Sequence, residues 1–124
     1  MYGFTESSAT LARGMEVTPK SIKAAYDLLR VTAFNGIKVR PSSKVKFVSK
    51  RLPKHHGLYY FPEHKMVIDA HITSVNKLLQ TVAHEMSHAV LDNNGDKTHH
   101  THDKHFQTVA DTICSIMGWP KGSV

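Results

Sequence analysis

The stretch His84-Glu85-Met86-Ser87-His88 lies inside a longer run, Thr73 to Asp92, whose apolar residues recur with the period of a helix. Two histidines four residues apart on a helix lie on the same face, so their ring nitrogens can reach one metal ion. Glu85 stands beside that pair, where a carboxylate can act as a general base. The stretch therefore predicts a hydrolytic site with one Zn²⁺ ion, at which a bound water has its pKa lowered to about 7.

The helical periodicity also separates the histidines from the side of the helix that faces the core. At about 100° per residue, the apolar positions fall on one broad arc: Val75, Leu78, Leu79, Val82, Ala83, Met86, Ala89 and Val90. His84 and His88 fall nearly opposite, and Glu85 falls at the border between the two sides. This argues against two histidines satisfied inside a core. It leaves open two solvated histidines on the exposed side of an amphipathic helix.

A third ligand must come from outside this helix, and the segment that follows is rich in histidine. Turn-forming residues 93–96 are predicted to end the helix, and Thr101 to cap a second helix that runs to Met117. His102 begins the inward-facing stripe of that second helix, so it is the expected third ligand. The second choice is His105, and a carboxylate of Asp103 or Asp111 is a further alternative. His99 and His100 are the least expected ligands, because they suit a solvated loop.

The motif and the segment after it together resemble a known family. His84-Glu85-Met86-Ser87-His88-Ala89, a short polar loop and then His102-Asp103-Lys104-His105-Phe106 are similar to the SprT-like metalloproteases, which include the Spartan DNA–protein crosslink proteases. The resemblance covers roughly residues 19–118. It implies that His84, His88 and His102 bind the zinc ion and that Glu85 is the catalytic base. The chain departs from the family pattern at Asp103, where the family usually has glycine.

The remaining patterns predict one α+β domain, residues 18–124, after an N-terminal arm, residues 1–17, of unassigned role, and the resemblance implies that this domain is zincin-like. Thr18-Pro19 starts a first helix, and Asn35-Gly36 stops it. A change to period two then predicts a small sheet of three or four strands, mainly antiparallel, at residues 37–40, 45–48, 57–61 and 66–69. As in zincins generally, the last strand is expected to be an exposed edge that holds a substrate chain beside the motif helix, with an ordinary edge strand as the alternative.

Length and composition restrict the class of protein. A chain of 124 residues with 40% hydrophobic residues suits one domain with a buried core. It has no apolar run of membrane-spanning length, no N-terminal signal pattern, and one cysteine, Cys114, which cannot form an internal disulfide. We therefore expect a cytoplasmic protein with no membrane partner. It would be associated with the nucleoid, or lie in the host cytoplasm if a phage encodes it.

The basic residues are unevenly spread along the chain. The formal charge is +6, and no acidic residue occurs between Leu28 and Pro62, a stretch that holds half of the lysines and arginines. Such a concentration predicts contact with a nucleic-acid backbone, with a basic face that only aids solubility as the alternative. The residues expected at this contact are Lys44, Lys46, Lys50, Arg51 and Lys54.

Two functional hypotheses follow from these patterns. The first is a zinc metallopeptidase with Glu85 as general base, and the resemblance implies DNA-associated or DNA-crosslinked proteins as its substrates. Its oxyanion stabiliser is open among His105, His71 and Tyr60. The second is a non-catalytic basic nucleic-acid-binding module with a structural zinc site, which a fourth ligand from His99 or His105 would favour. Three histidines also accept manganese, cobalt or nickel.

Overall fold

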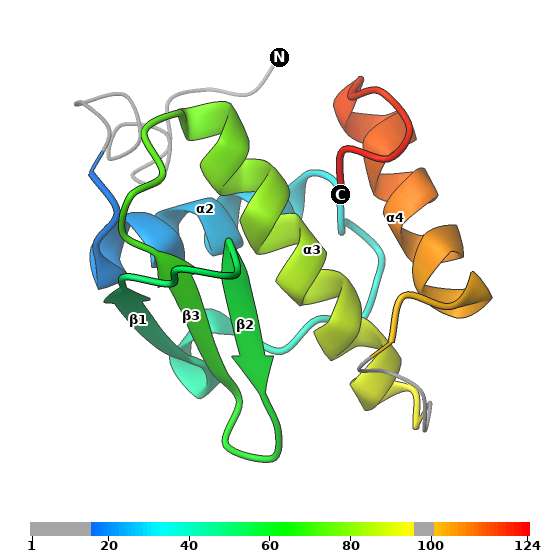
Figure 1. Ribbon diagram of the computed structural model, residues 1–124. Helices are drawn as coiled ribbons and strands as arrows, with labels where there is room; N and C mark the ends of the chain where they lie inside the picture. The colour runs from blue at the N-terminus through cyan, green and yellow to red at the C-terminus, as the bar shows by residue number, and fades with distance from the viewer. Residues whose placement is uncertain (1–15, 96–100) are drawn as a thin grey trace.

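The structure is a computed structural model, and it describes residues 16–95 and 101–124 (Figure 1). One helix comes first, short strands follow, and two helices close the chain. In chain order the elements are α2 (Pro19–Val31), the short 3-10 helix η1 (Ser42–Lys44), β1 (Lys46–Lys50), β2 (Gly57–Tyr60), β3 (Lys65–Asp69), α3 (Val75–Asn93) and α4 (Lys104–Met117). The predicted α+β class is confirmed. None of the described helices combines the length and the apolar character needed to cross a membrane.

The strands form one small mixed sheet in the order β1-β3-β2. β2 and β3 pair antiparallel, as the predicted hairpin, whereas β1 runs parallel to β3. The sequence predicted mainly antiparallel pairing; the difference arises because β3 lies between the two strands that precede it in the chain. The prediction that residues 66–69 form an exposed edge is wrong, because β3 is the central strand and has hydrogen-bonded neighbours on both sides.

Residues 37–40, which the sequence predicted as a strand, lie outside the sheet. A side chain holds their backbone instead: the hydroxyl of Tyr26 on α2 donates a hydrogen bond to the carbonyl oxygen of Arg40. Val39 is buried in the core, while Lys38 is exposed. The alternating pattern of this segment therefore reflects burial of one side of an extended chain, and not strand pairing.

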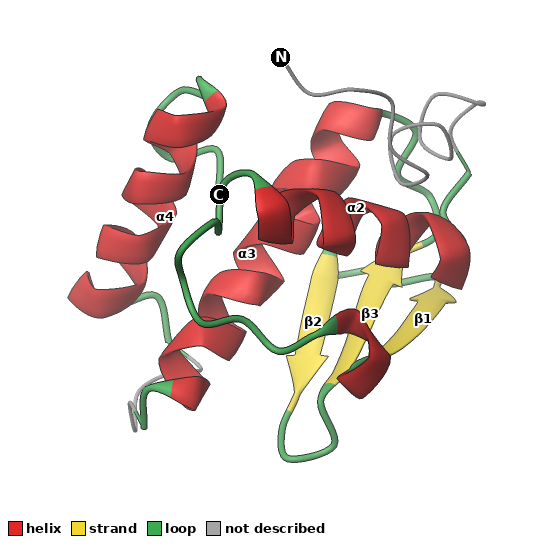
Figure 2. Ribbon diagram, turned by 180° about the vertical axis from the view of Figure 1, so that it is seen from behind, coloured by secondary structure: helices red, strands yellow, loops and turns green. Residues whose placement is uncertain are grey.

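The helices α2 and α3 cover the same face of the sheet (Figure 2). Strand alternation places two register rows on this face: Phe47, Met66 and Tyr59, and next to them Ser49, Ile68 and Gly57. At β1, the ring of Tyr26 meets that of Phe47 with centroids 5.4 Å apart. Lys46 and Lys50 alternate with these rows, so they lie on the other face of the sheet, where both are exposed. The basic side predicted for this strand is confirmed.

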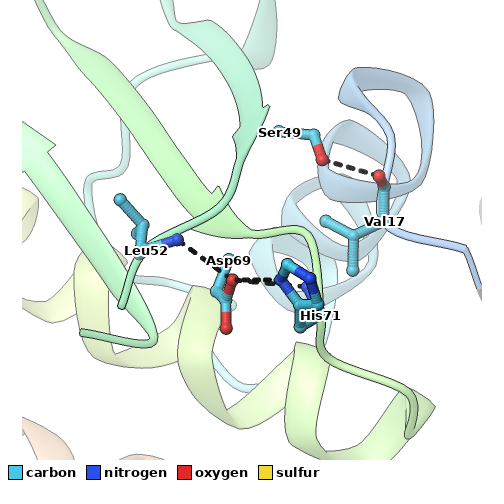
Figure 3. A network of polar contacts seen from close by, with 5 residues as sticks. All are labelled: Val17, Ser49, Leu52, Asp69 and His71. Atoms are coloured by element: carbon cyan, nitrogen blue, oxygen red, sulfur yellow. Dashed lines mark hydrogen bonds and ion pairs between the residues drawn. The ribbon is translucent and has the colours of Figure 1, made fainter. Parts of the chain in front are cut away.

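The chain before α2 is attached to the core. Thr18 caps α2 as predicted: its hydroxyl accepts a hydrogen bond from the Ser21 N–H, and the Ser21 hydroxyl oxygen accepts one from the Thr18 N–H. The Ser49 hydroxyl donates a 2.7 Å hydrogen bond to the carbonyl oxygen of Val17, which is itself buried (Figure 3). The end of the predicted arm thus belongs to the core, and residues 1–15 of that arm lie outside the described residues.

Asp69, at the end of β3, holds the loop between β1 and β2 at both ends. Its carboxylate accepts a hydrogen bond from the Leu52 N–H at 3.2 Å, and its own N–H donates to the His56 carbonyl oxygen at 2.8 Å. The same carboxylate oxygen lies 3.3 Å from Nδ1 of His71 (Figure 3). The residues between Leu52 and His56 are therefore fixed against the end of the central strand.

The last helix begins later than predicted. Its N-cap is Asp103 and not Thr101, because the Asp103 carboxylate accepts hydrogen bonds from the backbone N–H groups of His105 and Phe106, at 3.1 and 3.2 Å. His102 therefore lies just before the helix and not within its inward stripe. Asp103, the departure from the family pattern, has a clear structural role as the cap.

Replacing Asp103 by alanine removes the acceptor for two N–H groups at the start of α4. We expect this change to lower the free energy of unfolding by about 1 kcal/mol, whereas Asp103→Gly should cost only about a few tenths. Thermal unfolding of the metal-free protein measures both, with a fall in Tm of roughly 3–6 °C for the alanine variant. Equal losses in the two variants would contradict the capping role.

Candidate metal centre

The motif helix α3 is buried on two sides. The side of α3 that was predicted to face the core packs against the sheet, and Val82 and Met86 on this side are fully buried. The opposite side is also covered: His88 is 7% exposed, and Leu91 packs with residues of α4 in a second small apolar cluster. Because α4 lies against this side, the alternative of two solvated surface histidines is wrong for His88, and His84 is half-buried.

Three imidazoles converge between α3 and the start of α4. His84 and His88 lie one helical turn apart on α3, and His102 approaches them from the residue before the N-cap of α4. Nε2 of His102 lies 3.0 Å from Nε2 of His84 and 3.2 Å from Nε2 of His88. Two nitrogen ligands of a tetrahedral zinc ion are about 3.3 Å apart. The three side chains, whose ligand atoms all lie within 4.8 Å of one another, could therefore hold one metal ion.

The protonation of His84 also suits a metal ion. Burial, together with the neighbouring His88 and His102 rings, lowers the pKa of His84 to about 4, so this imidazole is neutral at physiological pH. A neutral imidazole has one N–H and one lone pair, so three Nε2 atoms that face one another cannot all be satisfied by hydrogen bonds among themselves. A cation that accepts three lone pairs satisfies them together, and it requires neutral histidines. The donor set therefore fits a metal ion.

Phe106 lies behind all three imidazoles. Its ring centroid is 4.9 Å from that of His84, 4.5 Å from that of His88 and 4.8 Å from that of His102. The ring is buried, so it restricts the orientation of the imidazoles from the side away from solvent. In the sequence, Phe106 stands only as part of the family motif and of the inward stripe; its spacing of four residues from His102 is the feature that points to this role.

Glu85 lies beside the histidines and under the first residue of β2. It is 5% exposed, and a Cβ atom at Gly57 would lie 3.2 Å from Glu85 Oε2, so the missing side chain leaves room for the carboxyl group. Burial raises the pKa of Glu85 to about 8, and a bound cation would favour its charged form. A cavity of about 280 Å³, here called the aromatic cavity, is bordered by Glu85, the three histidines, Gly57, Leu58, Tyr59 and Phe61.

The other predicted ligands lie elsewhere. His105 borders a separate surface hollow with Leu91 and Thr108, and Asp111 lies 3.8 Å from Nζ of Lys121. Among residues 16–95 and 101–124, no further histidine, cysteine or carboxylate joins the group of three histidines. His99 and His100 lie outside the described residues. The oxyanion candidates His105, His71 and Tyr60 do not border the aromatic cavity.

The residues predicted to contact nucleic acid are all exposed, and they divide between the two ends of β1. Lys44 and Lys46 lie at its beginning, and Lys50, Arg51 and Lys54 lie at its end and in the loop that follows. Of these, Lys54 also borders a second cavity that reaches Glu85.

Glu85→Gln should change how the stability of the metal-free protein depends on pH. The Glu85 carboxyl has a pKa of about 8 when folded and 4.5 as its ordinary value, so the stability that its neutral form provides is lost as the pH rises towards 8. Glutamine does not ionise, so the variant lacks this loss of stability. The difference in Tm, variant minus wild type, should therefore increase by roughly 5 °C or more between pH 5 and pH 8. His84 titrates in both proteins and cancels in this difference. Calorimetry with a chelator present measures it; a difference that does not change with pH would contradict the burial of an ionisable Glu85.

Phe106→Ala should loosen the three imidazoles. We expect metal affinity to fall by roughly 10- to 100-fold, because the rings lose the buried surface that orients them. Zinc competition against a chromophoric chelator measures the affinity, and Phe106→Leu, which keeps an apolar side chain there, is the control for packing. Unchanged zinc affinity in folded Phe106→Ala protein would show that the ring does not position the ligands.

The comparison with protein families agrees with this geometry. A model of the SprT-like family matches residues 22–122, from within α2 to beyond the end of α4, and so includes both segments that carry the histidines. No curated protein matches the chain. The family match spans most of the chain and includes the motif helix and the segment of the third histidine. The chain therefore belongs to the SprT-like family.

Proposed function

We propose that this chain is a zinc-dependent peptidase that cuts proteins associated with DNA or crosslinked to it. His84, His88 and His102 would hold the ion, and Glu85 would be the general base. The observation that carries the proposal is the position of a buried carboxyl group beside three converging imidazoles, all bordering one cavity. Membership of the SprT-like family supports the same chemistry.

Each residue has a separate role in this proposal. Bound Zn²⁺ supplies Lewis acidity and lowers the pKa of its water to about 7. Glu85 takes a proton from the attacking water and later gives it to the leaving amine. Burial raises the pKa of the Glu85 carboxyl whereas a bound cation would lower it, and these opposing effects suit a group that must both accept and release a proton. Gly57 leaves the space that the Glu85 carboxyl group occupies.

The edge of β2 is the candidate track for the substrate chain. β2 is an outer strand of the sheet with β3 as its hydrogen-bonded neighbour, and the aromatic cavity runs along it from Gly57 to Phe61. A peptide added to this edge would be held by main-chain hydrogen bonds, which tolerate many substrate sequences. This role replaces the one predicted for residues 66–69, whose strand is central.

Contact with DNA is proposed for the face of the sheet opposite α2 and α3. Lys46 and Lys50 of β1 project from it, and Lys65 of β3 shares the register row of Lys46 and lies 4.6 Å from the centroid of the Tyr60 ring. Exposed lysines suit phosphate contact, and the half-exposed Tyr60 ring suits stacking on a base.

A cleavage assay tests the proposal. Zinc-loaded wild type should cut a DNA-binding protein, and more strongly with single-stranded DNA present. Glu85→Gln should keep one zinc ion but cut at least about 100-fold more slowly, because it cannot carry the proton. Glu63→Gln, the same change at an exposed site outside the cavity, should retain activity.

Activity of Glu85→Gln close to that of wild type would overturn the role of Glu85. If neither protein cuts while both hold one zinc ion and bind DNA, the chain is a nucleic-acid-binding module with a structural metal site.

A further inference from the structure

A second cavity, of about 240 Å³, meets the first at Glu85. The two cavities share His55, Gly57, His84 and Glu85 as lining residues. The aromatic cavity continues along β2, whereas the second continues towards the loop after β1 and the first turn of α3. We call the second one the basic cavity, because Lys54 and Lys77 border it.

The charges that border the basic cavity do not balance. Lys54 and Lys77 are its two cationic residues, and Glu85 is the one acidic residue among the described residues that line it. Neither lysine makes an ion pair with an acidic side chain in the described part of the chain. The imidazoles of His55 and His56 and the amide of Gln80 add further hydrogen-bond donors. The cavity therefore favours a negatively charged group.

Both lysines belong to segments that are fixed relative to Glu85. Lys77 lies in the first turn of α3, and its N–H donates to the Ser74 hydroxyl that caps this helix. It lies about two turns before Glu85 on α3, and Thr81, four residues from each, also borders the cavity. Lys54 lies in the loop that Asp69 holds at both ends, through the Leu52 N–H and the His56 carbonyl oxygen. The backbone of both lysines therefore has a defined place beside the site, and both side chains border the cavity.

We propose that the basic cavity is a substrate subsite for an aspartate or glutamate side chain close to the bond that is cut. This inference rests on the proposed peptidase function. A chain laid along the edge of β2 and over Glu85 reaches both cavities, since Gly57 borders each of them. A nucleic-acid phosphate shares the charge, but a nucleotide strand at this place would occupy the path of the substrate chain. A volume of about 240 Å³ suits one side chain.

Paired peptides test the proposal. Peptides that wild type cuts are made with Glu or with Gln at each of the two positions on either side of the cleaved bond, and kcat/KM is measured. Wild type should prefer Glu by about fivefold at one position, the gain expected from a partly exposed ion pair. Lys77→Glu and Lys54→Glu should each lose this preference, and a Lys peptide should then be cut faster than the Glu peptide.

Lys23→Glu is the matched control, because it makes the same charge change at an exposed position on α2, and it should keep the wild-type preference. Lys77→Gln replaces Lys77→Glu if the latter lowers Tm, and it should also lose the preference. Equal rates for Glu and Gln peptides at all positions in wild type would overturn the proposal. So would an unchanged preference in both lysine variants.

Binding separates this proposal from the proposed function. Fluorescence anisotropy with zinc-loaded Glu85→Gln protein needs no turnover, and for this measurement the Glu and Gln peptides are two otherwise identical extended peptides that need not be substrates. Tighter binding of the Glu peptide therefore supports the subsite even if wild type cuts nothing. Equal affinities overturn it. If Lys77→Glu instead weakens binding of a single-stranded oligonucleotide and leaves peptide affinities unchanged, the cavity binds phosphate and the peptide assignment is wrong.

Discussion

The burial of Glu85 and His88 on one helix is the constraint on which the rest of the structure depends. Ionisable groups in an apolar interior are costly unless they are neutral, paired or bound to a cation. Here the sheet closes over α3 from one side and α4 from another, and both groups border a cavity. Burial keeps His84 neutral, as metal binding requires, and raises the pKa of the Glu85 carboxyl, so that a nearby cation would be needed to favour the charged form that can accept a proton.

The two other buried polar residues of α3, Thr81 and Ser87, are satisfied within the helix itself. The Thr81 hydroxyl donates to the Lys77 carbonyl oxygen, and the Ser87 hydroxyl donates to the Ala83 carbonyl oxygen, each one turn back. These short side chains need no partner from another element, so they can be buried without a compensating network.

The strand β2 connects the scaffold to the proposed chemistry. Strand alternation turns Gly57 towards α3, and a side chain there would meet Thr81, Ile68 and Glu85 at 3.0 to 3.2 Å. The glycine therefore lets the edge strand approach the helix closely, and this approach creates two cavities that meet at one carboxyl group. One cavity is aromatic and the other basic, so the two sides of a bound chain would meet different chemistry.

The sequence alone determined the features that depend on neighbouring residues. These are the motif helix, the cap at Thr18, the β2-β3 hairpin, the α+β class, and the histidines at positions 84, 88 and 102, which the fold brings together. Periodicity and capping act within a few residues, so a single sequence displays them. Only the tertiary structure decided four other features: the order of the strands, the burial of His88, the position of residues 37–40 outside the sheet, and the cavity at Lys54 and Lys77. Each of these depends on contacts between segments far apart in the chain, and the period of a strand or helix shows which side is buried but not what covers it.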